Sequence, residues 1–229
     1  MTRPAALRRS SVLVALAAVT VAGAPVVADL PTVQAVVSFA GRPVSAPGVQ
    51  VVSSLPSLGM QVVRGDAPAL ARLAQAPGVR GLAPDAAVRV TSGDDDGRDG
   101  ATGVLPSTGL GGSAGLAGAG AGARVAVIDT GVSDTAGLDR ASGRLVDAVD
   151  TSTGALRTGG RYDDGYGHGT FMANVVAGGA VPGTDGAALG VAPGATVLVV
   201  RVAGADGTTS LARVLLARRF HNDAVRDTL

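Results

Sequence analysis

The sequence contains no cysteine, no lysine and no glutamate, and only 2% of its residues are aromatic. The lack of cysteine excludes disulfide scaffolds, thiolate metal sites and a cysteine nucleophile. The lack of glutamate leaves no residue to act as the bidentate ligand of an EF-hand type calcium loop. A formal net charge of +1 argues against a nucleic-acid partner held by the release of counterions.

Apolar residues, by contrast, are plentiful. They make up 46% of the 229 residues, whereas charged residues make up 16%. This composition excludes wholesale disorder, and the length allows one or two domains with hydrophobic cores.

The first 28 residues have the pattern of a secretory signal peptide. Three arginines lie within the first nine residues, an apolar run spans 12–24, and the small residues Val26 and Ala28 mark a cleavage site. The run is shorter than the ~20 apolar residues that cross a bilayer, so we expect no membrane anchor after cleavage. The sequence therefore predicts a secreted, extracellular protein, by either the general or the twin-arginine route.

Residues 29–90 are predicted to form a small α+β domain. The segments 33–39 and 60–64 are rich in β-branched residues and predict strands, and 79–90 returns to strand character. A helix is expected between Asp66 and Gly78. The residues that indicate it are the cap Asp66, the first-turn Pro68, the apolar pair Leu70 and Leu73, and the terminating Gly78.

Residues 91–123 consist mainly of Gly, Ala and Asp and predict a linker. The acidic cluster Asp94–Asp96 is expected to be a solvated loop rather than a metal site.

Residues 124–229 alternate between strand and helix patterns, which predicts an α/β fold with a parallel sheet. The apolar segments 125–128 and 195–202 are expected to be strands buried on both faces. The segments 168–179 and 210–217 are expected to be helices. In the second helix, Ser210 is the expected N-cap, and Leu211, Val214 and Leu215 share one face.

Asp129 and His168 are the candidate functional residues of this region. Asp129 directly follows an apolar strand, and functional groups gather at the carboxyl ends of parallel strands. Gly131 allows the chain to turn sharply after it. His168 stands between two glycines at the start of a helix whose Ala173 and Ala177 allow close packing on the sheet.

The Asp-Thr-Gly segment at 129–131 is compatible with two protease chemistries. An aspartic protease needs two like carboxylates that share a proton, and this chain has only one such segment. That chemistry also gives no role to a histidine between glycines. A purely structural interpretation makes Asp129 a turn residue and His168 a loop residue.

Three motifs in order make the chain resemble the subtilase family of serine proteases: "VAVIDTGV", "GHGTFMA" and "GVAPGATVLVVRV". The resemblance implies an incomplete subtilisin-like parallel sheet with flanking helices. It also implies that Asp129 and His168 are the catalytic aspartate and histidine, with Asp129 orienting His168 as the general base. One departure is Asn174, where the family usually has glycine. The segment 70–90 resembles the inhibitory propeptide of secreted subtilases.

The family's nucleophilic serine motif is not found in this sequence. Ser210 is the only serine after His168, and Asn222 lies outside the segment that carries the oxyanion-hole asparagine in the family. The family pattern fades near Ala217, and His221 is expected to be an exposed tail residue. We therefore expect a peptidase region that ends before its nucleophile and is inactive alone.

The predicted function is that of a secreted subtilisin-like serine endopeptidase precursor, acting on peptide or protein substrates. The alternatives are a propeptide-type module that inhibits an intact subtilase in trans, or a remnant without function. No cofactor is expected, and structural calcium follows only from the family resemblance, with no ligand set among these residues.

Overall fold

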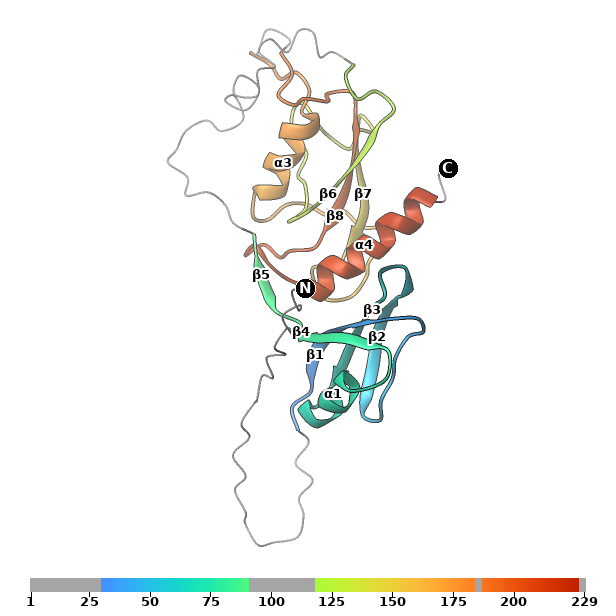
Figure 1. Ribbon diagram of the computed structural model, residues 1–229. Helices are drawn as coiled ribbons and strands as arrows, with labels where there is room; N and C mark the ends of the chain where they lie inside the picture. The colour runs from blue at the N-terminus through green and yellow to red at the C-terminus, as the bar shows by residue number, and fades with distance from the viewer. Residues whose placement is uncertain (1–29, 91–117, 184–186, 227–229) are drawn as a thin grey trace, which may run out of the picture. The chain divides into compact units, whose positions relative to one another are not determined.

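The computed structural model describes residues 30–90, 118–183 and 187–226, with side chains up to Arg218 (Figure 1). Some of the predicted features lie outside the described residues: the signal peptide, the acidic cluster Asp94–Asp96, most of the linker, and the side chains of His221 and Asn222.

The first described region is an antiparallel sheet of four strands in the order β2-β3-β1-β4. The strands are β1 (Val33–Phe39), β2 (Val49–Leu55), β3 (Met60–Gly65) and β4 (Val79–Pro84), and the short 3-10 helix η1 (Pro56–Leu58) joins β2 to β3. The predicted strands β1 and β3 lie at the sequence positions expected. β2 was not predicted.

Helix α1 (Ala67–Ala74) covers one face of this sheet. Its N-cap is Asp66, whose carboxylate accepts a hydrogen bond from the Ala69 N–H at 2.7 Å, as the sequence predicts. Leu70 and Leu73 are buried against the strands. The buried core of this region consists of Ala35, Val37, Phe39, Val44, Val63, Leu70 and Leu73. The predicted small α+β arrangement is confirmed.

The second region is built on a parallel sheet in the order β6-β8-β7. Its strands are β6 (Arg124–Asp129), β7 (Leu145–Asp150) and β8 (Thr196–Arg201). The ladder aligns Asp129 with Arg201 and Arg201 with Asp150, so three charged residues meet at the carboxyl edge. β7 was not predicted, because Asp147 and Asp150 interrupt its apolar pattern.

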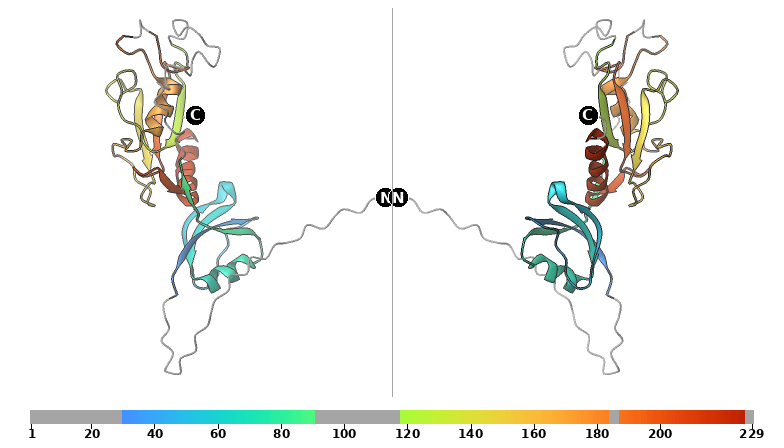
Figure 2. Two further views of the ribbon diagram at one scale, coloured as in Figure 1. Left: turned by 90° about the vertical axis from the view of Figure 1, so that its left-hand side faces the viewer. Right: turned by 90° about the vertical axis from the view of Figure 1, so that its right-hand side faces the viewer.

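Helices α3 (His168–Ala177) and α4 (Leu211–Arg226) cover opposite faces of this sheet (Figures 1 and 2). Ala173 and Ala177 of α3 are fully buried against Val127, Val197 and Val199. On the other face, Ala217 and Val214 of α4 pack with Val149, Val200 and Val202. The predicted α/β class, with helices flanking a parallel sheet, is confirmed.

Some details of this region differ from expectation. Ile128 is 39% exposed, so β6 is not buried along its whole length on both faces. Leu211 is 38% exposed, because the buried residues of α4 are the small Ala212 and Ala217 rather than the larger apolar ones. The helix was expected over 210–217 but continues to Arg226, so the backbone at His221 is helical.

A two-stranded antiparallel pair joins the two regions within the compact unit Pro31–Leu229. Strand β5 (Ala87–Arg89) pairs with β9 (Thr208–Ser210), and the Val90 N–H continues the ladder to the Gly207 carbonyl at 2.9 Å.

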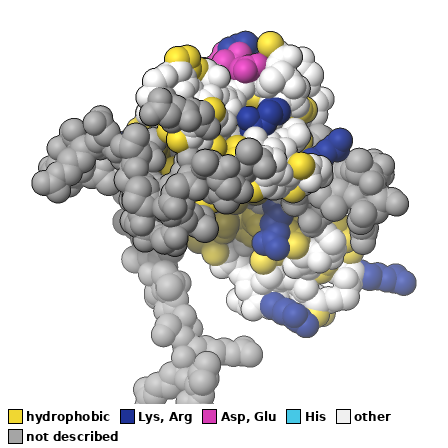
Figure 3. Space-filling view, turned by 90° about the horizontal axis from the view of Figure 1, so that it is seen from above, with side chains coloured by type: hydrophobic (Ala, Val, Ile, Leu, Met, Phe, Trp, Pro, Cys, Tyr) yellow, Lys and Arg dark blue, Asp and Glu magenta, His cyan; other side chains and the backbone are white. Residues whose placement is uncertain are grey.

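Surface side chains are mixed in character. On the face shown in Figure 3, basic side chains mostly stand apart from one another, and acidic ones gather beside one of them. No helix among the described residues is long and apolar enough to cross a membrane.

Candidate active site

Asp129 ends strand β6 with its carboxylate at the edge of the sheet. The residue is 9% exposed. Its Oδ1 accepts a hydrogen bond from the Thr130 N–H at 2.8 Å, and its backbone carbonyl accepts one from the Val202 N–H at 2.8 Å. These contacts hold Asp129 at the point where β6 meets the end of β8.

His168 is the first residue of α3, and its ring faces Asp129. The Nδ1 atom lies 2.9 Å from Oδ1 and 2.8 Å from Oδ2 of the carboxylate. Because an ionised carboxylate can only accept, Nδ1 carries the proton and donates it. That tautomer leaves the Nε2 lone pair available on a side chain that is 26% exposed. The structure therefore brings the two residues into contact, while their catalytic roles stay predictions.

Two glycines allow the segments carrying this pair to approach each other. A Cβ on Gly169 would lie 2.1 Å from the Gly131 carbonyl oxygen and 3.1 Å from the Asp129 Cβ. Gly131 has φ +106°, and a Cβ there would lie 2.6 Å from the Asp163 carbonyl oxygen. A side chain at Gly169 would push the loop after Asp129 away from α3, and one at Gly131 would push that loop away from the backbone of Tyr162 and Asp163.

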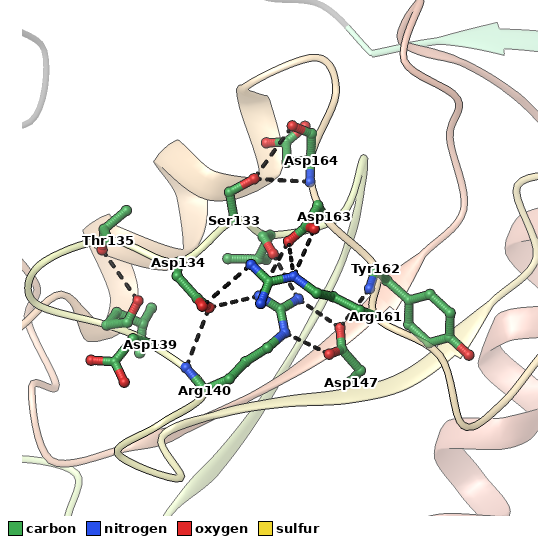
Figure 4. Close-up of polar contacts among 12 residues, drawn as sticks. Ser133, Asp134, Thr135, Asp139, Arg140, Asp147, Arg161, Tyr162, Asp163 and Asp164 are labelled. Atoms are coloured by element: carbon green, nitrogen blue, oxygen red, sulfur yellow. Dashed lines mark hydrogen bonds and ion pairs between the residues drawn. The ribbon is translucent and has the colours of Figure 1, made fainter.

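An ion-pair network fixes the loop after Asp129 against the loop before His168 (Figure 4). Arg140 donates to both carboxylate oxygens of Asp147 at 2.6 and 2.7 Å, and to Asp134 at 2.7 Å. The hydrogen bond to Asp147 raises the pKa of Arg140, against the effect of burial. Arg161 binds Asp163 through two hydrogen bonds of 2.9 and 2.7 Å. No sequence pattern indicated this network, because its partners are scattered over thirty residues.

Asp150 and Arg201 form an ion pair at the carboxyl edge of the β6-β8-β7 sheet. Asp150 is fully buried and accepts hydrogen bonds from Arg201 at 2.6 Å and from the Ser152 hydroxyl at 2.6 Å. Burial alone raises the pKa of Asp150, but the hydrogen bonds from Arg201 and Ser152 outweigh it and hold the pKa below its ordinary value. The carboxylate is therefore ionised at neutral pH and locks β7 to β8.

Asn174 is buried within α3 and does not prevent close packing. Its amide nitrogen donates to the Thr170 carbonyl at 2.9 Å, and its amide oxygen accepts from the Thr135 hydroxyl at 3.0 Å. The side chain thus ties α3 to the loop after Asp129.

Ser210 lies at the junction of β9 and α4, on a different element from Asp129 and His168. Its oxygen accepts a long 3.5 Å hydrogen bond from the Arg213 N–H, which fits the predicted N-cap. Asp85, which no sequence pattern singled out, caps the same helix more closely. Its carboxylate accepts from the Ala212 N–H at 2.8 Å and from the Ser210 hydroxyl at 2.9 Å.

Among the described residues, no group of three or more His, Cys, Asp or Glu side chains could hold a metal ion.

Comparison with known proteins connects this geometry to a family. Residues 120–225 match the sequence model of the subtilase family, and no curated protein matches the chain. Among solved structures, the epidermin leader peptide processing serine protease from Staphylococcus aureus is similar, with a TM-score of 0.56 and 19% identity. The similarity covers 84% of this chain and 48% of that one, so this chain spans about half the length of its structural relative.

The matched segment contains both Asp129 and His168, together with the sheet and helices that bring them together. Residues 120–225 therefore form a region that matches the subtilase family of serine proteases.

Proposed function

We propose that this chain supplies the aspartate and histidine of a secreted subtilisin-like serine endopeptidase precursor. The observation that carries the proposal is the 2.8 Å contact between His168 Nδ1 and the Asp129 carboxylate. In this arrangement Asp129 holds the ring with Nε2 available, and Nε2 takes the proton of a serine hydroxyl that attacks a peptide carbonyl. The positive charge that then forms on the imidazole is stabilised by the adjacent carboxylate.

The chain as given offers no serine for this role. Ser210 is the only serine after His168, and its hydroxyl is engaged with Asp85 and α4. Loss of the nucleophile alone costs a triad about 10⁶ in turnover. We therefore expect the 229 residues alone to be inactive. Peptide hydrolysis would require a protein that contains these residues together with a nucleophilic serine.

A fluorophosphonate probe, which labels activated serines, tests this proposal in two arms. The purified 229-residue chain is expected to remain unlabelled, and labelling that disappears in a Ser210→Ala variant would show that Ser210 is the nucleophile. In the second arm, the secreted proteins of the source organism are labelled and captured with an antibody against residues 124–218. A labelled protein is expected, and a His168→Ala strain should lack the label. No labelled protein in the parent strain would contradict the endopeptidase proposal.

A second candidate function is inhibition of an intact subtilase by residues 29–90, with residues 91–123 as the linker to the peptidase region. The pairing of β5 with β9 favours it, because an extended segment added to a strand edge is one way in which peptides are recognised. Titration of an active subtilisin with the full chain tests this function. Inhibition that weakens in an Asp85→Ala variant supports it, whereas undiminished hydrolysis at a hundredfold excess of chain contradicts it.

A further inference from the structure

The carboxylate of Asp164 lies four residues before His168 and accepts five hydrogen bonds. Its Oδ1 accepts from the Thr130 hydroxyl at 2.8 Å and from the N–H groups of Tyr166 and Gly167 at 2.9 and 2.8 Å. Its Oδ2 accepts from the N–H and the hydroxyl of Thr170, both at 2.8 Å. One side chain thus binds the turn before His168, the first turn of α3 and the residue after Asp129.

Thr130 completes the connection between the two triad positions. The residue is 1% exposed, and its hydroxyl oxygen both donates to Asp164 and accepts from the Gly169 N–H at 3.0 Å. Asp129 precedes Thr130, and His168 precedes Gly169. The Asp164–Thr130 contact therefore joins the backbone neighbours of both members of the pair.

The charge of Asp164 suits this position. The N-cap of α3 is Gly167, which has no side chain to accept the free N–H groups of the first turn, and the Asp164 carboxylate accepts two of these groups. A negative charge at a helix N-terminus is also favourable. Burial raises the pKa of Asp164, but hydrogen bonds from Gly167, Thr170 and Thr130 outweigh it and hold the pKa below its ordinary value.

We propose that Asp164 is a positioning residue that sets the orientation of the His168 ring toward Asp129, acting through Thr130 and the first turn of α3. This inference rests on the proposed function, because it concerns the same pair. All five groups facing the carboxylate are donors, so an asparagine must turn its NH₂ group toward at least one of them. Asp206 is the matched control, because its exposed carboxylate also accepts from the N–H and the hydroxyl of a threonine, Thr208, and takes no part in the ion-pair network of the two loops.

The readout is the His168 Nδ1–H proton, observed by NMR in the full chain labelled with ¹⁵N-histidine. The chain has only two histidines, and a His221→Gln variant assigns the signals. The His168 Nδ1–H signal is expected in the wild type and in Asp206→Asn. In Asp164→Asn its exchange with solvent should accelerate at least about tenfold, the equivalent of one hydrogen bond to a charged group. Circular dichroism is expected to retain the folded spectrum.

Variants of Thr130 test the same connection while the carboxylate stays in place. Thr130→Val removes the hydroxyl at nearly constant volume and should accelerate the exchange, whereas Thr130→Ser should restore the slow exchange. An unchanged signal in folded Asp164→Asn or Thr130→Val overturns the proposal. Unfolding of either variant where Asp206→Asn stays folded also overturns it, because the role is then structural for the whole region. If the wild type lacks the signal, the proposed function itself fails.

Discussion

At the scale of single residues, the close approach of the two segments that carry Asp129 and His168 depends on glycines. Gly131 has φ +106° and no space for a Cβ, whereas Gly154 has φ +85° and nothing within 4 Å of the position that a Cβ would occupy. The two positions therefore share the strain of a left-handed backbone, and the collision occurs only at Gly131. Alanine variants at the two positions can therefore separate the cost of the collision from the cost of the left-handed backbone.

We predict that Gly131→Ala lowers the free energy of unfolding by ~1–3 kcal/mol more than Gly154→Ala does, the usual cost of overpacking. Denaturation by urea, followed by circular dichroism, measures the difference. Equal losses in the two variants would mean that the Asp163 carbonyl moves aside without cost, and that the loop is less tightly held than these contacts imply.

The buried Asp150 predicts how stability depends on pH. Its pKa in the folded chain is below the unfolded value of ~3.9, so its contribution to stability is present above that value and is lost as pH falls through the folded pKa. The melting temperature of the wild type should therefore fall below about pH 4. Asp150→Asn should be less stable at neutral pH and should show a shallower fall. A fall in Asp150→Asn as steep as that of the wild type would contradict the assignment to Asp150.

At the scale of elements, local sequence patterns predicted some parts of the fold and missed others for physical reasons. Helix α1 was predicted because its cap and its apolar residues lie within one short segment. Strand β7 was missed because its half-buried Asp147 and its buried Asp150 are stabilised by Arg140 and Arg201, and Arg201 lies fifty-one residues from Asp150. A single sequence does not reveal which distant arginine compensates a buried aspartate.

The candidate active site shows the same difference between local patterns and long-range contacts. The contact between Asp129 and His168 could be predicted, because the motifs around both residues are local and specific. The contacts of Asp164, Thr130 and Asp85 could not, because they join segments that only the fold brings together.

Asp85, which lies just before β5, caps the start of α4 after β9, and this contact can be tested. Asp85→Ala should accelerate hydrogen exchange at the Ala212 amide, with a cost of ~0.5–2 kcal/mol for the lost cap. Asp66→Ala is the matched control, because it removes the cap of α1 and should accelerate exchange at Ala69 only. Unchanged exchange at Ala212 in Asp85→Ala would contradict the capping contact between the two regions.

At the scale of the whole molecule, the outer edge of β6 pairs with no strand among the described residues, and Ile128 beside it is 39% exposed. Unpaired strand edges and exposed apolar side chains promote association. We predict concentration-dependent self-association of the chain, measured by sedimentation velocity. Ile128→Lys should reduce it, and Leu156→Lys, at a 50% exposed loop position, should not. A monomer at every concentration would contradict this prediction.

In the proposed function, Asp129 orients His168 with the proton on Nδ1, and the whole proposal depends on this point. The most direct measurement is the ¹⁵N chemical shift pair of the His168 ring at a pH where the ring is neutral, which distinguishes the two tautomers. We predict the Nδ1–H tautomer in the wild type. We predict the opposite tautomer in Asp129→Asn, because the asparagine NH₂ group can donate to Nδ1. A wild-type ring that carries its proton on Nε2, or that is indifferent to Asp129→Asn, would contradict the proposed role of Asp129.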